Sequence, residues 1–211
     1  MTEGKFITFE GGEGCGKSTQ VAKVAEALAA RGIDVVRVRE PGGTPLAERV
    51  RGLLKDESDD PPCDRAELLL FLAARAQLVT NVIRPALDAG KWVVSDRFSD
   101  STFAYQGYGR GMDLDVIRVA NAFACDGVVP DLTLLMEVSP DVAARRMRSR
   151  ETATQTSADR IERAGDAFHS RLRAGFEALA DAEPQRIVRI DANGTVDEVW
   201  ETVWKHLLPM I

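Results

Sequence analysis

The sequence has few cysteines, no long apolar run and no excess of positive charge, and each lack excludes a class of protein. Its three cysteines, Cys15, Cys63 and Cys125, form no C-x-x-C pair and no disulfide framework, which fits a reducing compartment. No stretch of about 18 apolar residues offers a membrane span, and no signal peptide follows Lys5. The net charge of −6 argues against a nucleic-acid binder. We therefore expect a cytoplasmic protein with a small substrate and no nucleic-acid or membrane partner.

Apolar runs and helical patterns alternate along the chain and predict repeated βα units. With 211 residues, 45% of them hydrophobic, the chain can form one sizeable core, so we expect a single domain over residues 1–211. Strands are predicted at 6–9, 33–37, 92–95, 132–138 and 186–190. Helices are predicted at 18–31, 46–54, 65–88, 114–123, 140–150, 158–180 and 196–207. The expected fold is α/β and three-layered, with a parallel five-stranded sheet flanked by helices, because several strands are continuous apolar runs.

Residues 11–18 match the pattern G-x-x-x-x-G-K-[ST] at every fixed position, and they follow the predicted strand at 6–9. Glycines allow backbone N–H groups to close around phosphate oxygens, and the next helix points its positive end at them. Lys17 can reach the β- and γ-phosphates of a nucleotide, and the Ser18 hydroxyl can hold Mg²⁺. The pattern predicts a P-loop NTPase-type fold whose nucleotide site comprises Gly11, Gly12, Glu13, Gly14, Cys15, Gly16, Lys17, Ser18 and Thr19.

Asp96 and Arg97 follow the predicted strand at 92–95, so both should emerge at the carboxyl end of a parallel strand, where open α/β sheets bind ligands. An aspartate there can hold Mg²⁺ through water, and an arginine can bind phosphate as a bidentate fork. The alternative is a surface ion pair of little consequence. We favour the site, and we predict Ser18 and Asp96 as the metal ligands.

Two further segments allow both a structural and a functional interpretation. Arg75 lies four residues after Phe71 on one face of a predicted helix, where the pair could stack a base and hydrogen-bond its edge. The alternative is a core phenylalanine beside a surface arginine. Residues 149–158 contain no core-forming side chain and are flanked by arginines. They form either a solvated loop or a mobile lid, and we favour a lid at about 146–160.

Taken in order along the chain, these motifs resemble those of bacterial thymidylate kinases. The blocks that carry the resemblance are Phe9-Glu10-Gly11-x-Glu13-Gly14-x-Gly16-Lys17-Ser18-Thr19, Arg39-Glu40-Pro41-Gly42-Gly43-Thr44, Phe71-x-x-x-Arg75, Asp96-Arg97 and Tyr105-Gln106-Gly107. The likeness continues through Pro130-Asp131-Leu132-Thr133 and Asp159-Arg160-Ile161-Glu162. The resemblance implies transfer of the γ-phosphoryl group of ATP to dTMP, giving dTDP, with Mg²⁺ as cofactor and a homodimer as the assembly.

The resemblance also assigns the dTMP site. Phe71 would stack on thymine, and Arg75 and Thr102 would read the edge of the base. Arg97 would hold the dTMP phosphate, and Tyr105 would lie near the deoxyribose, where it crowds a 2′-hydroxyl. The remaining members of the set are Glu40, Pro41 near the thymine methyl group, Arg51 on the phosphate, and Gln106 close to the base.

Phosphoryl transfer brings two anionic phosphates together, so the protein must position them and neutralise their charge. The resemblance makes Glu13, Lys17 and Arg97 catalytic residues. Positions 12 to 15 hold no cation, unlike the phosphate loop of some members of the family, so the missing charge must come from elsewhere. The lid side offers Arg146, Arg148, Arg150 and Arg160 as candidates. Among them, we expect at least one of Arg148, Arg150 and Arg160 to act as an arginine finger.

Two other functions stay open as alternatives. Another nucleoside monophosphate kinase would share the phosphate loop and the arginine-rich lid, but Phe71 and Arg75 together with Tyr105 and Gln106 disfavour it. A nucleotide-dependent switch or partition module would use the bound nucleotide to control a partner. Against that, the sequence has no N-K-x-D guanine motif, and arginine rather than a switch-like glycine follows Asp96.

Overall fold

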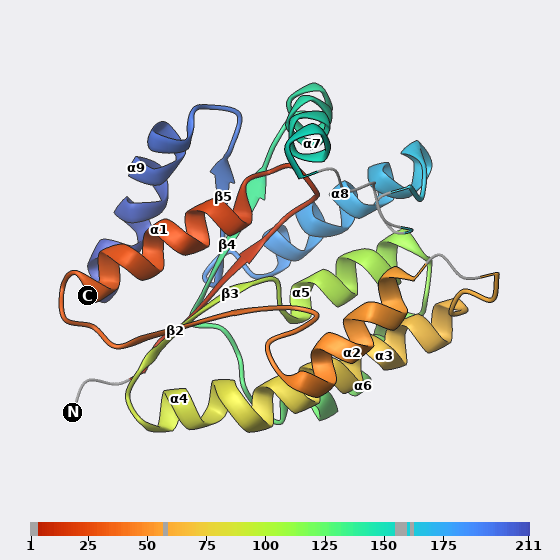
Figure 1. The fold of residues 1–211 in the computed structure, drawn as a ribbon, viewed down its shortest axis with the longest axis horizontal. Helices are drawn as coiled ribbons and strands as arrows, with labels where there is room; N and C mark the ends of the chain where they lie inside the picture. The colour runs from red at the N-terminus through yellow and green to blue at the C-terminus, as the bar shows by residue number, and fades with distance from the viewer. Residues whose placement is uncertain (1–3, 57–58, 155–159, 161–162) are drawn as a thin grey trace.

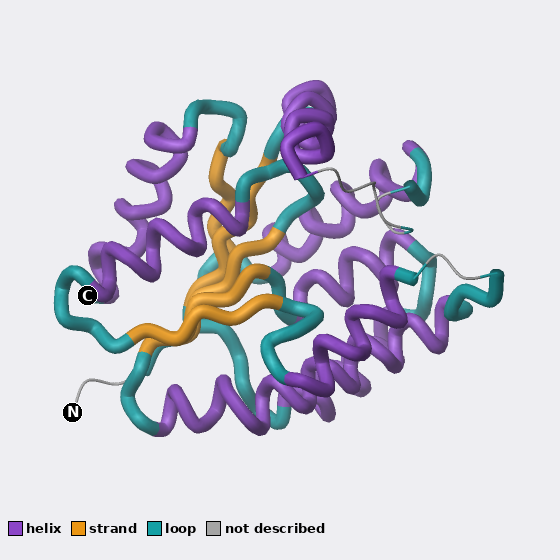
Figure 2. Tube along the Cα trace, in the orientation of Figure 1, coloured by secondary structure: helices purple, strands orange, loops and turns teal. Residues whose placement is uncertain are grey.

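Five short parallel strands form the centre of the computed structural model, which describes residues 4–56, 59–154, 160 and 163–211. The strands are β1 (Phe6–Glu10), β2 (Val35–Arg39), β3 (Trp92–Asp96), β4 (Leu132–Glu137) and β5 (Ile187–Asp191). Their order across the sheet is β2-β3-β1-β4-β5, and every neighbouring pair is parallel (Figure 2, orange). This sheet confirms the predicted fold class.

Helices cover both faces of the sheet and give the expected three layers. In Figure 1, α1 and α9 lie together on one face, α4 and α8 lie on the other, and α7 stands apart at the top, beside the phosphate loop. Two π-helical stretches, Val79–Ile83 and Phe103–Gly109, and a 3-10 turn, Leu208–Met210, complete the elements. The helices are α1 (Lys17–Ala29), α2 (Pro45–Lys55), α3 (Asp64–Leu78), α4 (Arg84–Asp88), α5 (Ser99–Thr102), α6 (Leu114–Cys125), α7 (Pro140–Thr154), α8 (Asp166–Ala182) and α9 (Val196–Leu207).

Side chains of β1 alternate between two hydrophobic cores. Ile7 and Phe9 belong to the core under α1 and α9, whereas Phe6 packs with Val93 in the core on the opposite face. All five residues of β1 are buried. Burial on both faces explains why this strand is a continuous apolar run rather than an alternating one.

The strand β2 begins two residues later than predicted and ends two residues later. It lies at the edge of the sheet and pairs with β3 in the register Val35 to Trp92. Arg37 and Arg39 are exposed on it, while Ile33 packs into the core before the strand starts. The prediction began too early because Ile33 packs against the core without being part of the strand. It ended too early because Arg39, a charged residue, belongs to an edge strand, where exposed charged side chains are common.

The helix predicted at 65–88 is present but not uniform. α3 passes into the π-helical stretch Val79–Ile83 and then into α4. Pro85 lies in the first turn of α4. Because proline lacks an N–H and its ring crowds the carbonyl four residues earlier, an α-helix cannot pass it unchanged. The wider π-helical turn before Pro85 accommodates the ring.

By length and composition, the helical run Asp64–Asp88 could cross a membrane, a property not predicted from the sequence. Its packing is that of a core helix. Leu78 and Ile83 are fully buried among strand residues, and the charged side chains of Glu67 and Arg75 are buried in ion pairs with other parts of the domain. The run is thus explained by the core of the α/β domain.

The lid segment differs from the prediction at both ends. α7 continues to Thr154, so residues 149–154 are helical rather than part of a loop. Residues 149, 150, 152 and 153 are exposed, so the lack of core-forming side chains reflected an exposed stretch of helix, and arginine and glutamate form helices well without burial. α8 begins at Asp166 after Gly165, not at 158. Residues 155–159, the part of the predicted lid between α7 and Arg160, lie outside the described residues.

Residues 99–109 are helical although no helix is predicted between β3 and α6. Glycine is a poor helix former, so Gly107 and Gly109 favour a loop locally. Packing overrides that preference, because a Cβ on Gly109 would lie 2.6 Å from the ring of Phe168 on α8. Only glycine permits this approach, which fixes the π-helical stretch Phe103–Gly109 against α8.

Candidate active site

A cavity of about 500 Å³ lies at the carboxyl ends of β1, β2 and β3, beside α2 and α3. It brings together most of the predicted site residues, namely Glu13, Gly14, Gly16, Lys17, Ser18, Thr19, Glu40, Pro41, Arg51, Phe71, Arg75, Asp96, Arg97, Thr102, Tyr105, Gln106 and Arg150. Arg146, one of the lid-side candidates, lines it as well. Four lining residues were not predicted: Arg39, Leu54, Lys55 and Ser101. Five predicted residues are not part of the lining: Gly11, Gly12, Cys15, Arg148 and Arg160.

The phosphate loop joins β1 to α1 and holds its own lysine. Gly16, in the left-handed region with φ 90°, precedes the first residue of α1, which leaves the first N–H groups of the helix free to face a ligand. Lys17 is 6% exposed, and its Nζ donates to the carbonyl oxygens of Gly11 at 3.1 Å and Gly12 at 2.8 Å. The buried Cys15 thiol donates to Gly12 O, which favours its interpretation as a packing residue of the loop.

The two predicted metal ligands contact one another. The Ser18 hydroxyl donates to the Asp96 carboxylate, so the start of α1 and the end of β3 present adjacent oxygens to the cavity. No group of three acidic, histidine or cysteine side chains suited to a metal occurs in the described part of the chain. Two protein oxygens beside a phosphate loop fit Mg²⁺, which commonly takes its remaining ligands from water and substrate phosphates.

Arg97 and Glu13 form a charged pair across the mouth of the loop. Arg97 has φ 74°, in the left-handed region that non-glycine residues rarely adopt. Its Nη2 donates to Glu13 at 2.5 Å, and Arg150 Nη1 lies 3.7 Å from the other oxygen of Glu13. Burial alone would raise the pKa of Glu13, but Arg97, then Lys17 and Arg150, outweigh it and lower the pKa to about 2. Three cations therefore surround one ionised carboxylate where phosphates would lie.

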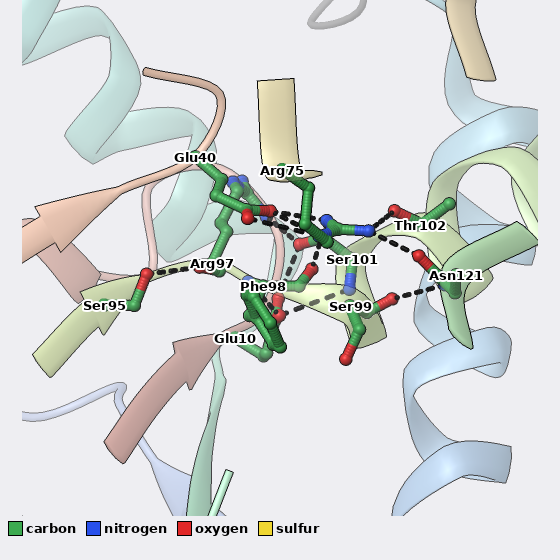
Figure 3. A network of polar contacts seen from close by, with 10 residues as sticks. All are labelled: Glu10, Glu40, Arg75, Ser95, Arg97, Phe98, Ser99, Ser101, Thr102 and Asn121. Carbon is green, nitrogen blue, oxygen red and sulfur yellow. Dashed lines mark hydrogen bonds and ion pairs between the residues drawn. The ribbon is translucent and has the colours of Figure 1, made fainter. Parts of the chain in front are cut away.

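Arg75 is the centre of a buried network. This excludes the alternative interpretation of Arg75 as a surface arginine beside a core phenylalanine. Its side chain is 1% exposed and pairs with Glu40, which is 4% exposed. Nε and Nη2 donate to the Glu40 carboxylate, and Nη2 also donates to Phe98 O (Figure 3). Nη1 donates to the side-chain oxygens of Thr102 and Asn121. Burial would lower the pKa of Arg75, but the charge of Glu40 outweighs it and raises the pKa.

This network uses all five N–H donors of the Arg75 guanidinium. It ties α3 to the end of β2 through Glu40, to α5 through Thr102, and to α6 through Asn121. The role of Arg75 at the edge of a base stays a prediction, because a base oxygen would have to replace one of these partners. Two partners in this network were not predicted from the sequence: Phe98, in the turn after β3, and Asn121, on α6. Neither belongs to a recognisable motif of its own.

The apolar wall of the cavity comes from Phe71 on α3 and from Pro41 in the loop after β2. Phe71 and Pro41 line the cavity and are half-buried, so a flat ring could be placed against them. Phe71 also packs against a small core cluster with Val50 and Leu54, so it is partly a core residue as well. Arg51, one turn before Leu54 on α2, donates to Pro41 O at 3.0 Å and lines the same cavity.

Tyr105 and Gln106 enter the cavity from the π-helical stretch. The Arg97 guanidinium lies over the Tyr105 ring, 5.0 Å from its centroid. Burial raises the pKa of Tyr105, and its hydroxyl makes no hydrogen bond to any described residue. A buried hydroxyl without a partner needs an explanation, and a ligand in the cavity supplies one. Gln106 Nε2 donates to Glu67 Oε1 at 3.0 Å.

Glu67 is a buried residue of the site that sequence reasoning missed. Its side chain is 1% exposed, and it accepts from Arg110 Nη2 at 3.0 Å as well as from Gln106 and Arg160. Burial opposes ionisation, but the hydrogen bonds from Arg110 and Gln106 outweigh it and lower the pKa of Glu67. A glutamate one turn before Phe71 in an apolar stretch was the available signal, since such a residue needs a partner when buried.

The structure separates the three predicted finger arginines. Arg150 lines the cavity beside Glu13, whereas Arg148 is exposed and does not line it. Arg160 donates to Glu67, at the α3 side of the site rather than at the phosphate loop. Arg146, also on α7, lines the cavity and donates to the carbonyl oxygens of the loop after β5.

Known proteins resemble this chain along nearly its whole length. A thymidylate kinase of Solidesulfovibrio magneticus is 50% identical over 206 residues, covering 94% of this chain and 96% of that protein. One of Chromohalobacter salexigens is 50% identical over 208 residues, covering 98% and 96%. The crystal structure of thymidylate kinase from Ehrlichia chaffeensis matches with a TM-score of 0.76 and 36% identity, covering 97% of this chain and 98% of that one. The family model described as thymidylate kinase matches residues 9–203, so the chain belongs to the thymidylate kinase family.

Proposed function

We propose that this protein is an ATP-dependent thymidylate kinase, which transfers the γ-phosphoryl group of ATP to dTMP and releases dTDP and ADP. The continuity of the cavity carries this proposal, since Lys17 and Ser18 line one end and Phe71 and Arg75 the other. Phosphoryl transfer needs both reactants in line within one site. Because dTDP is one phosphorylation short of dTTP, we place the reaction in cytoplasmic dTTP synthesis.

During the transfer, a phosphate oxygen of dTMP bonds to the γ-phosphorus of ATP while the bond from that phosphorus to the bridging oxygen of ADP breaks. Lys17 would exchange its carbonyl partners, Gly11 and Gly12, for β- and γ-phosphate oxygens. Arg97, already turned toward the loop by Glu13, would hold the dTMP phosphate. These residues position the reactants and neutralise their charge.

The paired oxygens of Ser18 and Asp96 would hold Mg²⁺ together with the phosphates of ATP. Their contact across the mouth of the loop supports this assignment. When bound there, the metal ion would neutralise charge on the β- and γ-phosphates. Ser18 would bind through its hydroxyl, and Asp96 directly or through a water molecule.

For the acceptor, we propose that Phe71 stacks on the thymine ring and that Pro41 contacts its methyl group. Arg51, fixed by its hydrogen bond to Pro41, would share the dTMP phosphate with Arg97. The unpartnered hydroxyl of Tyr105 would lie beside the deoxyribose. A 2′-hydroxyl would compete for that space, which disfavours ribonucleotides.

We propose that polar side chains lining the cavity recognise the edge of the base. Thr102, which accepts from Arg75, and Gln106, which donates to Glu67, both line the cavity. Arg75 would join them by exchanging one of its present acceptors for a base oxygen. Glu40 would keep the guanidinium in place by its ion pair.

For the finger arginine, we propose Arg150. It lies 3.7 Å from Glu13 and lines the cavity, so it can reach a phosphoryl group held over the loop. Arg148 and Arg160, predicted together with it, lie at other surfaces in this structure. The proposal gives the missing positive charge of positions 12 to 15 one source on α7.

A panel of acceptors tests the function. With saturating ATP and Mg²⁺, we expect the highest kcat/KM for dTMP, a lower value for dUMP, and poor turnover of AMP, CMP, GMP and UMP. The thymine methyl group in an apolar pocket should be worth about 1–3 kcal/mol, or about 10–200-fold. If AMP or CMP matched dTMP in kcat/KM, the assignment would be wrong and another nucleoside monophosphate kinase would be the better one.

We also propose that the protein is a homodimer that pairs through α6. Val116, Val119 and Phe123 stand on one face of this helix and are 56%, 73% and 89% exposed. Leu69 on the neighbouring α3 is 64% exposed. Large apolar side chains exposed together on one helix face indicate an interaction site. Analytical ultracentrifugation should give twice the chain mass for the wild-type protein and a monomer for Phe123→Asp; a wild-type monomer would refute the proposal.

A further inference from the structure

Glu10 is a buried carboxylate that the proposed mechanism does not use. It ends β1 next to the phosphate loop, is 0% exposed and does not line the cavity, so it cannot touch a nucleotide. Its Oε1 accepts the backbone N–H groups of Phe98 at 2.8 Å and Ser101 at 3.2 Å, and its Oε2 accepts the Ser101 hydroxyl at 2.5 Å (Figure 3). Every one of these donors lies in the turn that follows Arg97.

That turn holds Arg97 in an unfavourable backbone conformation. Its φ of 74° persists only where the surroundings fix it more firmly than the residue's own preference. Ser95 Oγ donates to Arg97 O at 2.6 Å, and Arg97 N donates to Phe9 O at 2.9 Å, which secures the turn from the sheet side. On the other side, Glu10 takes the N–H groups at the start of α5, which no side chain of α5 caps.

The Ser101 hydroxyl links the carboxylate of Glu10 to the guanidinium group of Arg97. Its hydroxyl donates to Glu10 and accepts from Arg97 Nη1 at 3.2 Å, and Gly11 O accepts from the same nitrogen at 2.8 Å. Both protons of Nη1 are thereby used. Nη2 donates to Glu13, and Nε has no partner among the described residues. The protein therefore uses both protons of Nη1 and one of Nη2, and Nε with the second proton of Nη2 is left to donate to a phosphate.

Keeping a carboxylate at this position is unfavourable. Burial above all, and then Asp100, raise the pKa of Glu10 to about 7, while Arg97 and the hydrogen bonds from Ser101 and Phe98 oppose the shift. Asp100 is itself held by Arg186 at 2.8 Å, so it is not available to replace Glu10. A buried acid without contact to the cavity would be replaced by an apolar side chain at little cost if nothing depended on its acceptors.

We propose that Glu10 is a positioning residue for phosphoryl transfer, whose carboxylate holds the turn at 97–101 so that Arg97 points across the phosphate loop. The inference rests on the proposed role of Arg97 as a phosphate ligand. Glu10 directly precedes the phosphate loop, which binds the donor nucleotide. The inference nevertheless gives Glu10 a function in the acceptor half of the site.

The test is kinetic. Glu10→Gln keeps the size of the side chain but places an amide N–H₂ where an acceptor is needed. We expect it to raise KM for the monophosphate and lower kcat, with kcat/KM falling about 10–100-fold, as for a misplaced catalytic group, and KM for ATP changing by less than about threefold. Ser101→Ala removes the hydroxyl between Glu10 and Arg97 but keeps both backbone N–H donors to Glu10, so it should give a smaller change in the same direction.

Thr8→Val is the matched control, since Thr8 is also 0% exposed on β1 and hydrogen-bonds only across the sheet, to Thr133. It should lower the melting temperature with kinetic constants near those of wild type. In an Arg97→Lys background, Glu10→Gln should change kcat/KM by less than about twofold, because both changes act through one group.

The proposal fails if Glu10→Gln lowers the melting temperature but leaves KM and kcat within about twofold of wild type. It also fails if the effects of Glu10→Gln and Arg97→Lys are additive, since residues that act independently add. If Glu10→Gln does not fold, Ser101→Ala alone decides by the same criteria. The acceptor is the monophosphate that the wild-type protein turns over fastest, so a wrong choice of acceptor would refute the proposed function while still testing Glu10.

Discussion

The two ends of the cavity are constructed in opposite ways. At the donor end, consecutive residues form the site, and the partners of Lys17 are backbone carbonyls within the same loop. At the acceptor end, side chains from β2, α3, α5 and α6 meet, and buried ion pairs such as Arg75 with Glu40 hold them together. The donor end is thus fixed by local backbone conformation, and the acceptor end by contacts distant in sequence. A substitution that removes a charge at the donor end should lower turnover without unfolding the protein. One that removes a charge at the acceptor end should also lower the free energy of unfolding.

The strongest test of the donor end is Lys17→Ala. Because the loop is shaped by its backbone, we expect an unchanged circular dichroism spectrum and only a small shift in melting temperature. Turnover of ATP with dTMP should fall by at least about 10³-fold, the order associated with a cation positioned on the transferred phosphoryl group. A variant with near-normal kcat would contradict the role of Lys17, and one that is unfolded would contradict the comparison between the two ends.

The next prediction concerns α7. Arg150→Ala should lower kcat at saturating ATP and dTMP by about 10³-fold or more, as expected for loss of an arginine finger. Arg148→Ala is its matched control on the same helix, and it should stay within about threefold of wild type because Arg148 is exposed and does not line the cavity. Equal effects of the two substitutions would show that the helix as a whole, not one side chain, supplies the charge.

At the acceptor end, Arg75→Ala should destabilise the fold. It leaves Glu40 buried without its partner, and breaking a buried pair in this way costs about 3–5 kcal/mol in the free energy of unfolding. Removing both charges, in Arg75→Met with Glu40→Gln, should restore part of the loss. Urea denaturation of the two variants measures both values. A single variant as stable as wild type would mean that Arg75 serves the substrate alone.

Phe71→Ala separates stacking from core packing at the same end. We expect KM for dTMP to rise by the equivalent of about 1–3 kcal/mol, by analogy with bases stacked on aromatic side chains, with little change in KM for ATP. If Phe71 acts only in the core, the variant will instead lose about 3–5 kcal/mol of stability and keep both KM values. Kinetics and thermal melting on one preparation distinguish the two results.

The smallest expected effect is the pH dependence from Glu13. Its pKa is lowered from the ordinary value of 4.5 to about 2, so the ionised form stabilises the folded state above pH 4.5, and this contribution is lost as the pH falls from 4.5 toward 2. The difference in unfolding free energy between wild type and Glu13→Gln should therefore be constant at neutral pH and shrink in acid. A difference that does not change down to about pH 3 would place Glu13 outside the cation cluster.

The same contrast decides what could be predicted from sequence. The phosphate loop and β1, β3 and β4 were predictable because their signals are local: a glycine pattern and short apolar runs. The helical residues 99–109 were not, because their conformation depends on packing against α8. Glu67 and the burial of Arg75 were missed for a related reason. A charged residue in an apolar stretch of helix indicates only that it would need a partner if it were buried. The partners themselves, Gln106 for Glu67 and Glu40 for Arg75, come from distant segments that only the fold brings near.

The close approach between α8 and the π-helical stretch Phe103–Gly109 has a consequence for how this sequence can diverge. Each element offers a glycine to an aromatic side chain of the other, Gly109 to Phe168 and Gly175 to Tyr108. An alanine at Gly109 is tolerable only if the ring of Phe168 becomes smaller. An alanine at Gly175 would lie 2.7 Å from the Cβ of Tyr108, an atom that every side chain except glycine has, so a smaller ring there would not make room. We therefore expect Gly109 to vary among related sequences only together with Phe168, and Gly175 to stay glycine whatever side chain stands at position 108.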